Sequence, residues 1–354
     1  MFYKISIRPF FFLIDAESIH NFILNFLSKA TFLYPLIKLI YYPKVRSEIN
    51  IGNLKFRNPL GLAAGFDKNG IAIRFFEALG FSHMEVGTVT PLPQQGNDRP
   101  RIFRLKKDHA LINRLGFNNK GADEVKKNIL EARKFTGKDF IIGVNIGKNK
   151  NTAIKDAFND YKICFEKLYD AADYFTINIS SPNTEGLRKL QEEQYLDTLL
   201  FEIQKLNKEI SKSKSSTNKC IFLKIAPDLS DEMIKMIFNV TLKNDLTGIV
   251  ATNTTVERIN LNTNIIEQCG LSGKPLKLLS DAVLERLNEL NKTGALILIG
   301  AGGIFDRKDF NDKRNAGASL VQLYTGFIYE GPAVVKKILK DEPRRAQRTQ
   351  RSLG

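Results

Sequence analysis

The pattern of apolar and polar positions changes near residue 48. Beyond it, short apolar runs alternate with polar stretches that are each long enough for a crossover helix, which indicates parallel strands. Eight such units over roughly 280 residues predict an α/β fold of the (β/α)₈ TIM-barrel type. The runs are Leu60–Ala63, Met84–Gly87, Ile141–Ile146, Phe175–Ile179, Ile221–Ile225, Gly248–Ala251, Leu296–Gly300 and Leu320–Tyr324.

A doubly wound sheet is the alternative to a barrel. It usually has fewer strands and a GxGxxG turn after the first one, whereas the first turn here reads GLAAGFDKNG.

Residues 1–47 form a separate, mostly apolar segment that we expect to be helical. Asp15 can cap a helix whose apolar residues fall on one face: Ile19, Phe22, Ile23, Phe26 and Leu27. The apolar stretch ATFLYPLIKLIYYP follows and is interrupted by Pro35.

Two interpretations of this segment stay open. It is either a helical hairpin folded onto the main domain, or a pair of helices that dip into a membrane surface. In the second case the basic residues Lys29, Lys38, Lys44 and Arg46 would face lipid headgroups. We therefore predict three parts: an N-terminal helical extension (1–47), the barrel (48–340) and a disordered tail (341–354) whose sequence PRRAQRTQRSLG has no apolar period.

Polar residues gather where the predicted strands end. Asn145 and Asn178 close the third and fourth strands, and Lys224 lies inside the apolar fifth strand. The carboxyl ends of barrel strands share one face, where active sites are built. The continuation of the fourth strand, FTINISSPNTEGLR, is read as part of that site rather than as a plain turn.

Glycines late in the chain indicate a phosphate. The segments GLSGKP, GAGG and YTG supply backbone N–H groups near the last barrel strands, where such folds commonly hold phosphate. They suggest a phosphorylated cofactor over the barrel mouth.

Composition and charge limit the classes of partner to expect. The 354 residues carry a formal net charge of +15, but the lysines and arginines are scattered and accompany no nucleic-acid module. We expect no nucleic acid as partner, and an anionic substrate or lipid suits the charge equally well. Three distant cysteines and three dispersed histidines argue against a disulfide framework and a metal site.

At this point the residues resemble a known family, the class 2, quinone-dependent dihydroorotate dehydrogenases. The resemblance runs in order from about Asn50 to Pro332. It rests on NPLGLAAGFDKNG, EVGTVTPLPQQGNDRPRIFRL, LINRLGFNN, GVNIGKNK, INISSPNTEGLR, KIAPDLS, ATNTT, CGLSGKPL and GASLVQLYTGFIYEGP. One departure is Cys269, where the family usually has Gly.

The resemblance implies an FMN enzyme that oxidises (S)-dihydroorotate to orotate in pyrimidine biosynthesis and passes electrons to a membrane quinone. It implies one FMN per chain, held by Ala63, Ala64, Gly65, Thr88, Asn145, Asn178, Lys224, Thr252, Ser272, Gly273, Gly302, Gly303, Tyr324 and Thr325. Orotate contacts would be Lys68, Asn113, Arg114, Leu115, Gly116, Phe117, Asn178, Asn183, Asn253 and Thr254. Quinone contacts would include His20, Arg104 and Tyr324.

The resemblance also gives Ser181 a role, as the base that removes a proton from C5 while hydride leaves C6 for the flavin. A serine hydroxyl is a poor base, so the proton must move on, and we expect it to do so through Thr184 and a water beneath Phe117. The related soluble class uses cysteine at this place, and Cys164, Cys220 and Cys269 all lie outside this loop.

Two competing functions remain. Another FMN barrel, oxidising a dihydropyrimidine or a hydroxyacid, is one; the hydroxyacid type needs a late active-site histidine, and none follows His109. The other is a non-catalytic membrane protein built on a barrel, which would be expected to lack Ser181 or the asparagines. We expect a monomer on the cytoplasmic face of a bacterial inner membrane, with a mitochondrial inner membrane as the alternative.

Overall fold

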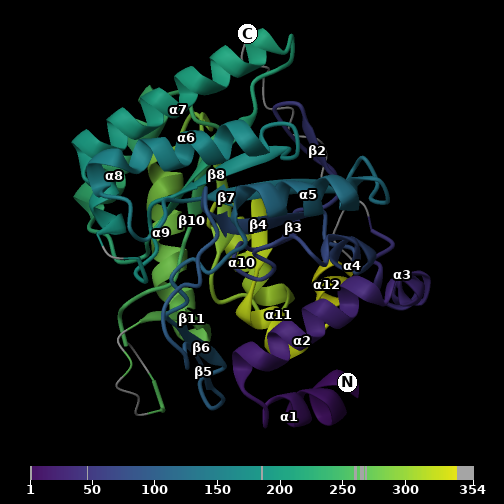
Figure 1. Ribbon diagram of the computed structural model, residues 1–354. Helices are drawn as coiled ribbons and strands as arrows, with labels where there is room; N and C mark the ends of the chain where they lie inside the picture. The colour runs from purple at the N-terminus through teal and green to yellow at the C-terminus, as the bar shows by residue number, and fades with distance from the viewer. Residues whose placement is uncertain are drawn as a thin grey trace.

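Eight parallel strands close into a barrel, which confirms the predicted fold (Figure 1). The computed structural model describes residues 2–45, 47–184, 186–258, 261–263, 267 and 269–340. Each strand pairs with the next along the chain, and the last pairs with the first. The strands are β3 (Leu60–Leu62), β4 (His83–Val89), β7 (Ile141–Ile146), β8 (Tyr174–Asn178), β9 (Cys220–Ile225), β10 (Gly248–Ala251), β12 (Ile297–Ala301) and β13 (Leu320–Leu323). All eight coincide with the predicted runs.

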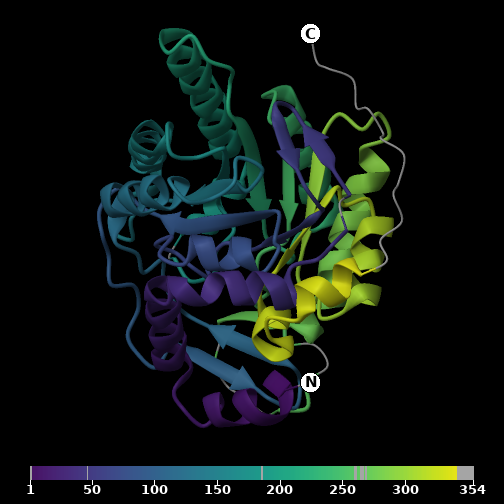
Figure 2. The same cartoon turned by 90° about the vertical axis from the view of Figure 1, so that its right-hand side faces the viewer.

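Helices follow the strands and cover the barrel (Figures 1 and 2). They are α4 (Ile73–Ala78), α5 (Gly121–Arg133), α6 (Ala157–Leu168), α7 (Glu193–Ser213), α8 (Asp231–Lys243), α9 (Lys277–Leu290), α10 (Arg307–Asn315), α11 (Thr325–Glu330) and α12 (Val334–Leu339). The predicted disordered tail, 341–354, lies outside the described residues.

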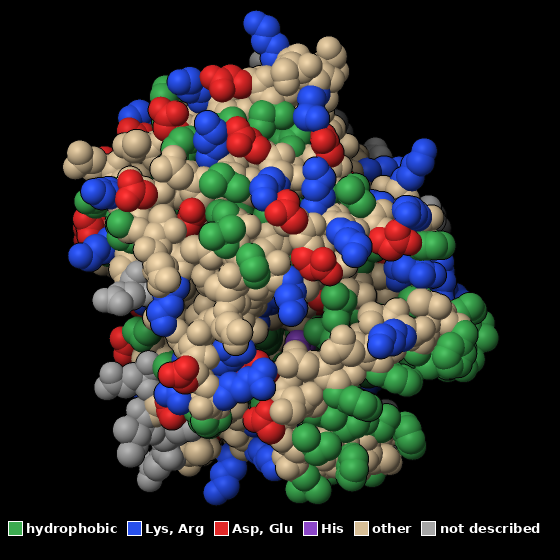
Figure 3. All heavy atoms as spheres, in the orientation of Figure 1, with side chains coloured by type: hydrophobic (Ala, Val, Ile, Leu, Met, Phe, Trp, Pro, Cys, Tyr) green, Lys and Arg blue, Asp and Glu red, His purple; other side chains and the backbone are tan. Residues whose placement is uncertain are grey.

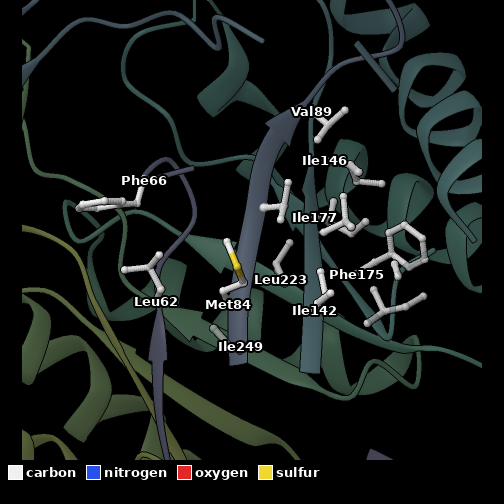
Figure 4. Close-up of a cluster of buried hydrophobic side chains, with 14 of the residues drawn as sticks. Leu62, Phe66, Met84, Val89, Ile142, Ile146, Phe175, Ile177, Leu223 and Ile249 are labelled. Atoms are coloured by element: carbon white, nitrogen blue, oxygen red, sulfur yellow. The ribbon is translucent and has the colours of Figure 1, made fainter. Parts of the chain in front are cut away.

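Alternation along each strand separates two sets of side chains. On β8, Phe175 and Ile177 join the large hydrophobic cluster between strands and helices. Figure 4 shows these two with Met84, Ile142 and Leu223 from neighbouring strands. Tyr174 alternates with them and belongs instead to the cluster inside the barrel. Side-chain period 2 therefore assigns one face to the helices and the other to the barrel interior.

The amino-terminal end of the barrel is closed by a hairpin. Strands β1 (Ile49–Ile51) and β2 (Leu54–Phe56) pair antiparallel. Ile51, Leu54 and Phe56 are buried against the interior cluster that contains Phe222. Because the hairpin closes this end, a ligand can enter the barrel at the opposite end, where the strands have their carboxyl ends.

A second small sheet lies at that other end. It contains β5 (Ile102–Leu105), β6 (Ala110–Asn113) and β11 (Gly270–Gly273), in the order β11-β6-β5. The register of β6 with β11 places Asn113 opposite Gly270 and Leu111 opposite Ser272. These contacts bring segments from the beginning and the end of the barrel together over its mouth.

The N-terminal segment is helical and packs at the same end, away from the hairpin (Figure 2). A π-helix, Tyr3–Ile7, leads into α1 (Arg8–Phe11), followed by α2 (Ala16–Lys29), a 3₁₀ turn (Thr31–Leu33) and α3 (Tyr34–Tyr41). As predicted, the Asp15 carboxylate caps α2 by accepting a hydrogen bond of 2.9 Å from the Ser18 N–H. Pro35 lies in the first turn of α3, where its missing N–H costs nothing, rather than breaking a helix.

The predicted apolar face of α2 is only partly buried. Ile19 is buried, but so are Glu17 and Leu24, whereas Phe22 and Phe26 point outward. The reason is the buried ion pair of Glu17 with Arg101, at 2.7 Å, which turns that side of the helix toward the barrel.

Among the described residues no single helix is long and apolar enough to cross a membrane. Only the bent pair Tyr3–Phe11 and Ala16–Lys29, which meet at 119°, passes a test of length and composition together.

Candidate active site

A cavity opens at the carboxyl ends of the barrel strands and collects most of the predicted site residues. Those that line it come from seven of the eight βα units, all but that of β7, and from the small sheet: Ala63, Ala64, Gly65, Lys68, Thr88, Asn113, Leu115, Gly116, Phe117, Asn178, Ser181, Asn183, Lys224, Thr252, Asn253, Thr254, Ser272, Gly273, Gly302, Gly303, Tyr324 and Thr325.

Amides form a connected network in the wall of this cavity. The Asn178 side-chain N–H groups donate to Thr88 Oγ1 at 2.9 Å and to Asn145 Oδ1 at 3.0 Å. Its Oδ1 accepts from Ser180 Oγ at 3.1 Å. Asn178 thus links three strands, and Asn145, buried one layer below, supports the wall without lining the cavity itself.

A second pair of amides faces across the mouth. Asn183, from the loop after β8, donates to Asn113 Oδ1 at 2.9 Å. Asn253, after β10, donates to Ser180 Oγ at 3.0 Å. Amides both donate and accept, so this side of the cavity suits a planar ligand with both kinds of group.

Ser181 lies in the same loop and is buried. Its Oγ accepts a hydrogen bond of 3.2 Å from the Asn183 N–H. The Thr184 hydroxyl is also buried and has no partner among the described residues. An unsatisfied buried hydroxyl is costly, which makes Thr184 a candidate for a hydrogen bond to water or ligand.

Two lysines bring charge to the cavity. Burial lowers the pKa of Lys68 to about 8, an effect that Arg101 reinforces while Glu17 and Asp67 oppose it. Burial also lowers the pKa of Lys224, and the charge of Glu85 opposes that shift. A desolvated ammonium gains most from an anionic partner, so each lysine favours an anion or an electron-rich ring.

Two late glycines pack against α9 too closely for a side chain. A Cβ on Gly303 (φ +75°) would lie 2.4 Å from Lys277 Cβ, and one on Gly302 (φ +110°) would lie 2.9 Å from Ser280 Oγ. The backbone of the β12 turn therefore approaches α9 closely and lines the cavity directly. Ser272 Oγ and Thr325 Oγ1 are hydrogen-bonded at 2.8 Å in the same region.

A larger second cavity, of about 850 Å³, lies between α2 and the barrel mouth. It contains the other two predicted residues, His20 and Arg104. His20 Nε2 donates to the Phe66 carbonyl at 2.8 Å, and burial lowers its pKa to about 4. Six residues line both cavities: Gly65, Lys68, Asn113, Leu115, Ser272 and Tyr324. The two spaces therefore share a wall.

Arg114 is placed differently from its predicted neighbours. Its guanidinium donates to the Pro100 carbonyl at 2.8 Å and forms an ion pair with Glu267 at 3.2 Å. It does not line the cavity.

Two polar residues in or beneath the cavity were not predicted from the sequence. Gln322 lines the cavity, and Glu85 is fully buried beneath it. The signal for Glu85 was available: like Lys224, it is a charged residue within an apolar strand.

Arg188, which holds two loops of the site together, was not predicted either. Arg188 donates to the Ser180 carbonyl at 3.2 Å and the Thr254 carbonyl at 3.3 Å, and pairs with Asp228 at 3.0 Å. A loop arginine gives no comparable signal in the sequence.

Comparison with known proteins agrees with this geometry. The family model described as "Dihydroorotate dehydrogenase" matches residues 46–345. A curated relative from Shewanella woodyi, named "Dihydroorotate dehydrogenase (quinone)", is 48% identical over 96% of this chain and 98% of its own. One of the same name from Christiangramia forsetii is 47% identical over 95% and 97%. A DHODH from Eimeria tenella solved in complex with ferulenol superposes with a TM-score of 0.84 at 37% identity, covering 92% of this chain and 90% of its own.

Proposed function

The chain belongs to the dihydroorotate dehydrogenase family of oxidoreductases, and we propose that it oxidises dihydroorotate with FMN as resident cofactor and a membrane quinone as acceptor. In this proposal Ser181 is the catalytic base. The observation that carries it is the pair of cavities with a common wall. One is built from amides, two lysines and Ser181, and the other lies under the N-terminal helices.

The residues present fit FMN. Gly302 and Gly303 line the cavity and bring backbone N–H groups to it, the kind of donor that suits a phosphate. Lys224 lies in the wall as a buried cation, and Gln322 Oε1 is buried without a partner among the described residues. We assign the phosphate end to Ser272, Gly273, Gly302, Gly303, Tyr324 and Thr325, and the ring to Ala63, Ala64, Gly65, Thr88, Asn178, Lys224 and Thr252, with Asn145 supporting that wall from below. When bound, FMN would supply the two-electron acceptor of the oxidation.

The substrate side fits orotate, a flat anion with alternating donors and acceptors. Asn113, Asn183 and Asn253 offer amides around one part of the cavity. Lys68 offers charge for the carboxylate. Leu115, Gly116 and Phe117 add an apolar wall that excludes water.

The surroundings of Ser181 support its role as the base. Its Oγ accepts the Asn183 N–H, which leaves the hydroxyl hydrogen free to point to Thr184 or to a water. Thr184 has the unpartnered buried hydroxyl that such a relay requires. Serine and threonine together can then move the proton away from the substrate carbon.

The second cavity fits the quinone. Ile19, Ile23, Leu24 and Leu27 of α2 line it together with Phe75 and Phe76, and His20, Arg104 and Tyr324 supply polar groups. Tyr324 lies in both cavities, so it marks where the acceptor would approach the cofactor.

The surface over α1 and α3 supports membrane contact. Figure 3 shows hydrophobic side chains gathered there. Leu13 and Leu39 each expose 80% of their surface, and Phe10 and Phe32 expose 63% and 78%. Lys29, Lys38 and Lys44 are exposed in the same segment, and Arg46 lies outside the described residues. Apolar faces flanked by lysines suit the headgroup boundary of a bilayer, so we propose peripheral attachment through these helices.

An absorbance experiment tests the proposal. The purified protein should show flavin bands that bleach when dihydroorotate is added without oxygen and recover when a quinone follows. A protein without flavin bands would favour a non-catalytic barrel. Flavin bands that ignore dihydroorotate but bleach with another dihydropyrimidine would favour a different substrate.

A further inference from the structure

Glu85 lies at the centre of a polar layer just below the cavity. It belongs to β4 and is fully buried inside the barrel. Three strands direct donors at it: Asn145 Nδ2 at 2.8 Å, Gln322 Nε2 at 2.9 Å and the Tyr174 hydroxyl at 3.3 Å. An ionised carboxylate can only accept, so all three neighbours must donate to it.

This requirement fixes the orientation of the amides above. Because Asn145 uses its N–H groups on Glu85, its Oδ1 faces upward and accepts from Thr88 at 2.5 Å and from Asn178 at 3.0 Å. Asn178 in turn must turn its own oxygen toward Ser180. Turning any one amide over would set donor against donor.

Gln322 is oriented in the same way. Its Nε2 is bonded to Glu85, so its Oε1 is the atom left over; that oxygen is buried without a partner in the described part of the chain, and Gln322 lines the cavity. The cavity therefore offers a hydrogen-bond acceptor that needs a donor from the ligand. The flavin ring carries an imide N–H flanked by carbonyls, which is a group of that kind.

Lys224 completes the layer. It lies on β9, lines the cavity and makes no hydrogen bond to any residue that the structure describes. Glu85 raises the pKa of this buried lysine against the larger lowering caused by burial. The carboxylate thus helps to keep the cation that faces the cavity.

We propose that Glu85 is a positioning residue: it fixes the Asn145 and Gln322 amides in one orientation and balances the charge of Lys224, and so sets the reduction potential of the cofactor. The inference rests on the proposed function, because the group affected is FMN. The opposing interpretation is that Glu85 only satisfies its three buried donors and has no effect on the cofactor.

The test is Glu85→Gln in the FMN-loaded protein, with the flavin midpoint potential measured at pH 6 and pH 8. Loss of the negative charge leaves Lys224 uncompensated and favours the reduced, more negative ring. At pH 6 we expect the ratio of reduced to oxidised flavin at a fixed ambient potential to rise at least tenfold, about 30 mV for a two-electron couple. The rise should shrink at pH 8, because Lys224 without Glu85 loses its proton more easily.

Glu77→Gln is the matched control. Glu77 is a partly buried carboxylate on α4; it accepts from the Gly137 N–H at 2.9 Å and does not line the cavity. Its variant should keep the wild-type potential. A Glu85→Gln potential equal to wild type, or more negative at pH 6, would overturn the inference.

A second variant covers the case in which Glu85→Gln fails to fold. The exchange Glu85→Gln with Gln322→Glu keeps the charge and the hydrogen bond but moves the carboxylate into the cavity wall. We expect a potential below wild type, since the negative charge now borders the ring, whereas an unchanged potential overturns the proposal. If the wild-type protein holds no flavin, the proposed function has failed; flavin with unchanged potentials contradicts only the role of Glu85.

Discussion

At the scale of single residues, the chemistry of the cavity comes from burial of groups that water would otherwise mask. Ser181, Thr184 and Lys224 are each less than a tenth exposed. An unpaired hydroxyl or ammonium at such a place costs stability, which implies that a ligand or water completes it. These residues are therefore the ones to change first.

Ser181→Ala is the first prediction. The variant should keep its flavin, because Ser181 makes no hydrogen bond to the residues assigned to FMN among those described. Flavin reduction by dihydroorotate should slow by at least ~10²-fold, the usual scale for loss of an acid–base group. Stopped-flow bleaching measures it, and a rate near wild type would remove Ser181 from the mechanism.

Lys68 gives a pH-dependent prediction. Its pKa of about 8 means that the ammonium is charged below pH 8 and neutral above it. If it binds the substrate carboxylate, KM for dihydroorotate should be lowest below pH 8 and rise as the pH passes through 8. Lys68→Met should raise KM at pH 7 and remove the change near pH 8; a KM that rises equally in this variant would assign the effect to another group.

At the scale of elements, the eight strands were predictable because each is an apolar run bounded by polar residues. Their polar ends were predictable too, since the carboxyl ends of parallel strands meet at one face. The role of Arg188 was not, because its partners, the Ser180 and Thr254 carbonyls, are backbone atoms that any residue supplies. The face of α2 that is buried was not predictable either, because the ion pair at Glu17 rather than apolar periodicity determines which side faces the barrel.

The loop contact of Arg188 carries the third prediction. Arg188→Met removes the ion pair to Asp228 and two hydrogen bonds that join the loops holding Ser181 and Asn253. Hydrogen bonds to charged groups contribute about 1.5–3 kcal/mol, so we expect KM to rise about tenfold or more. Flavin content should not change. Arg286→Met, at a surface ion pair of α9 with Glu289, is the control and should leave KM unchanged. An equal effect of both variants would contradict a specific role of Arg188 in joining the two loops.

At the scale of the whole molecule, the N-terminal helices combine two features that the sequence left as alternatives: packing on the barrel and an apolar surface suited to a membrane. They pack onto the barrel, because Glu17 pairs with Arg101 and Ile19 and Leu24 are buried. They also expose a broad apolar surface on α1 and α3 (Figure 3). Deleting residues 1–42 would therefore remove the carboxylate partner of Arg101 and the packing of α2 on the barrel, and loss of function would not separate packing from membrane contact.

Surface substitutions separate the two features and make the last prediction. Phe10, Leu13, Phe32 and Leu39 are exposed, and none lines either cavity. Changing all four to Ser should leave the melting temperature and the reduction of the flavin by dihydroorotate close to wild type. Binding to vesicles that contain anionic lipid should fall sharply, because burial of apolar area drives that binding. Turnover with a long-chain quinone in vesicles should fall with it, whereas turnover with a short, water-soluble quinone should persist, since the second cavity is intact. If both quinones are reduced as fast as by the wild type and vesicle binding is unchanged, the exposed surface of α1 and α3 does not serve membrane attachment.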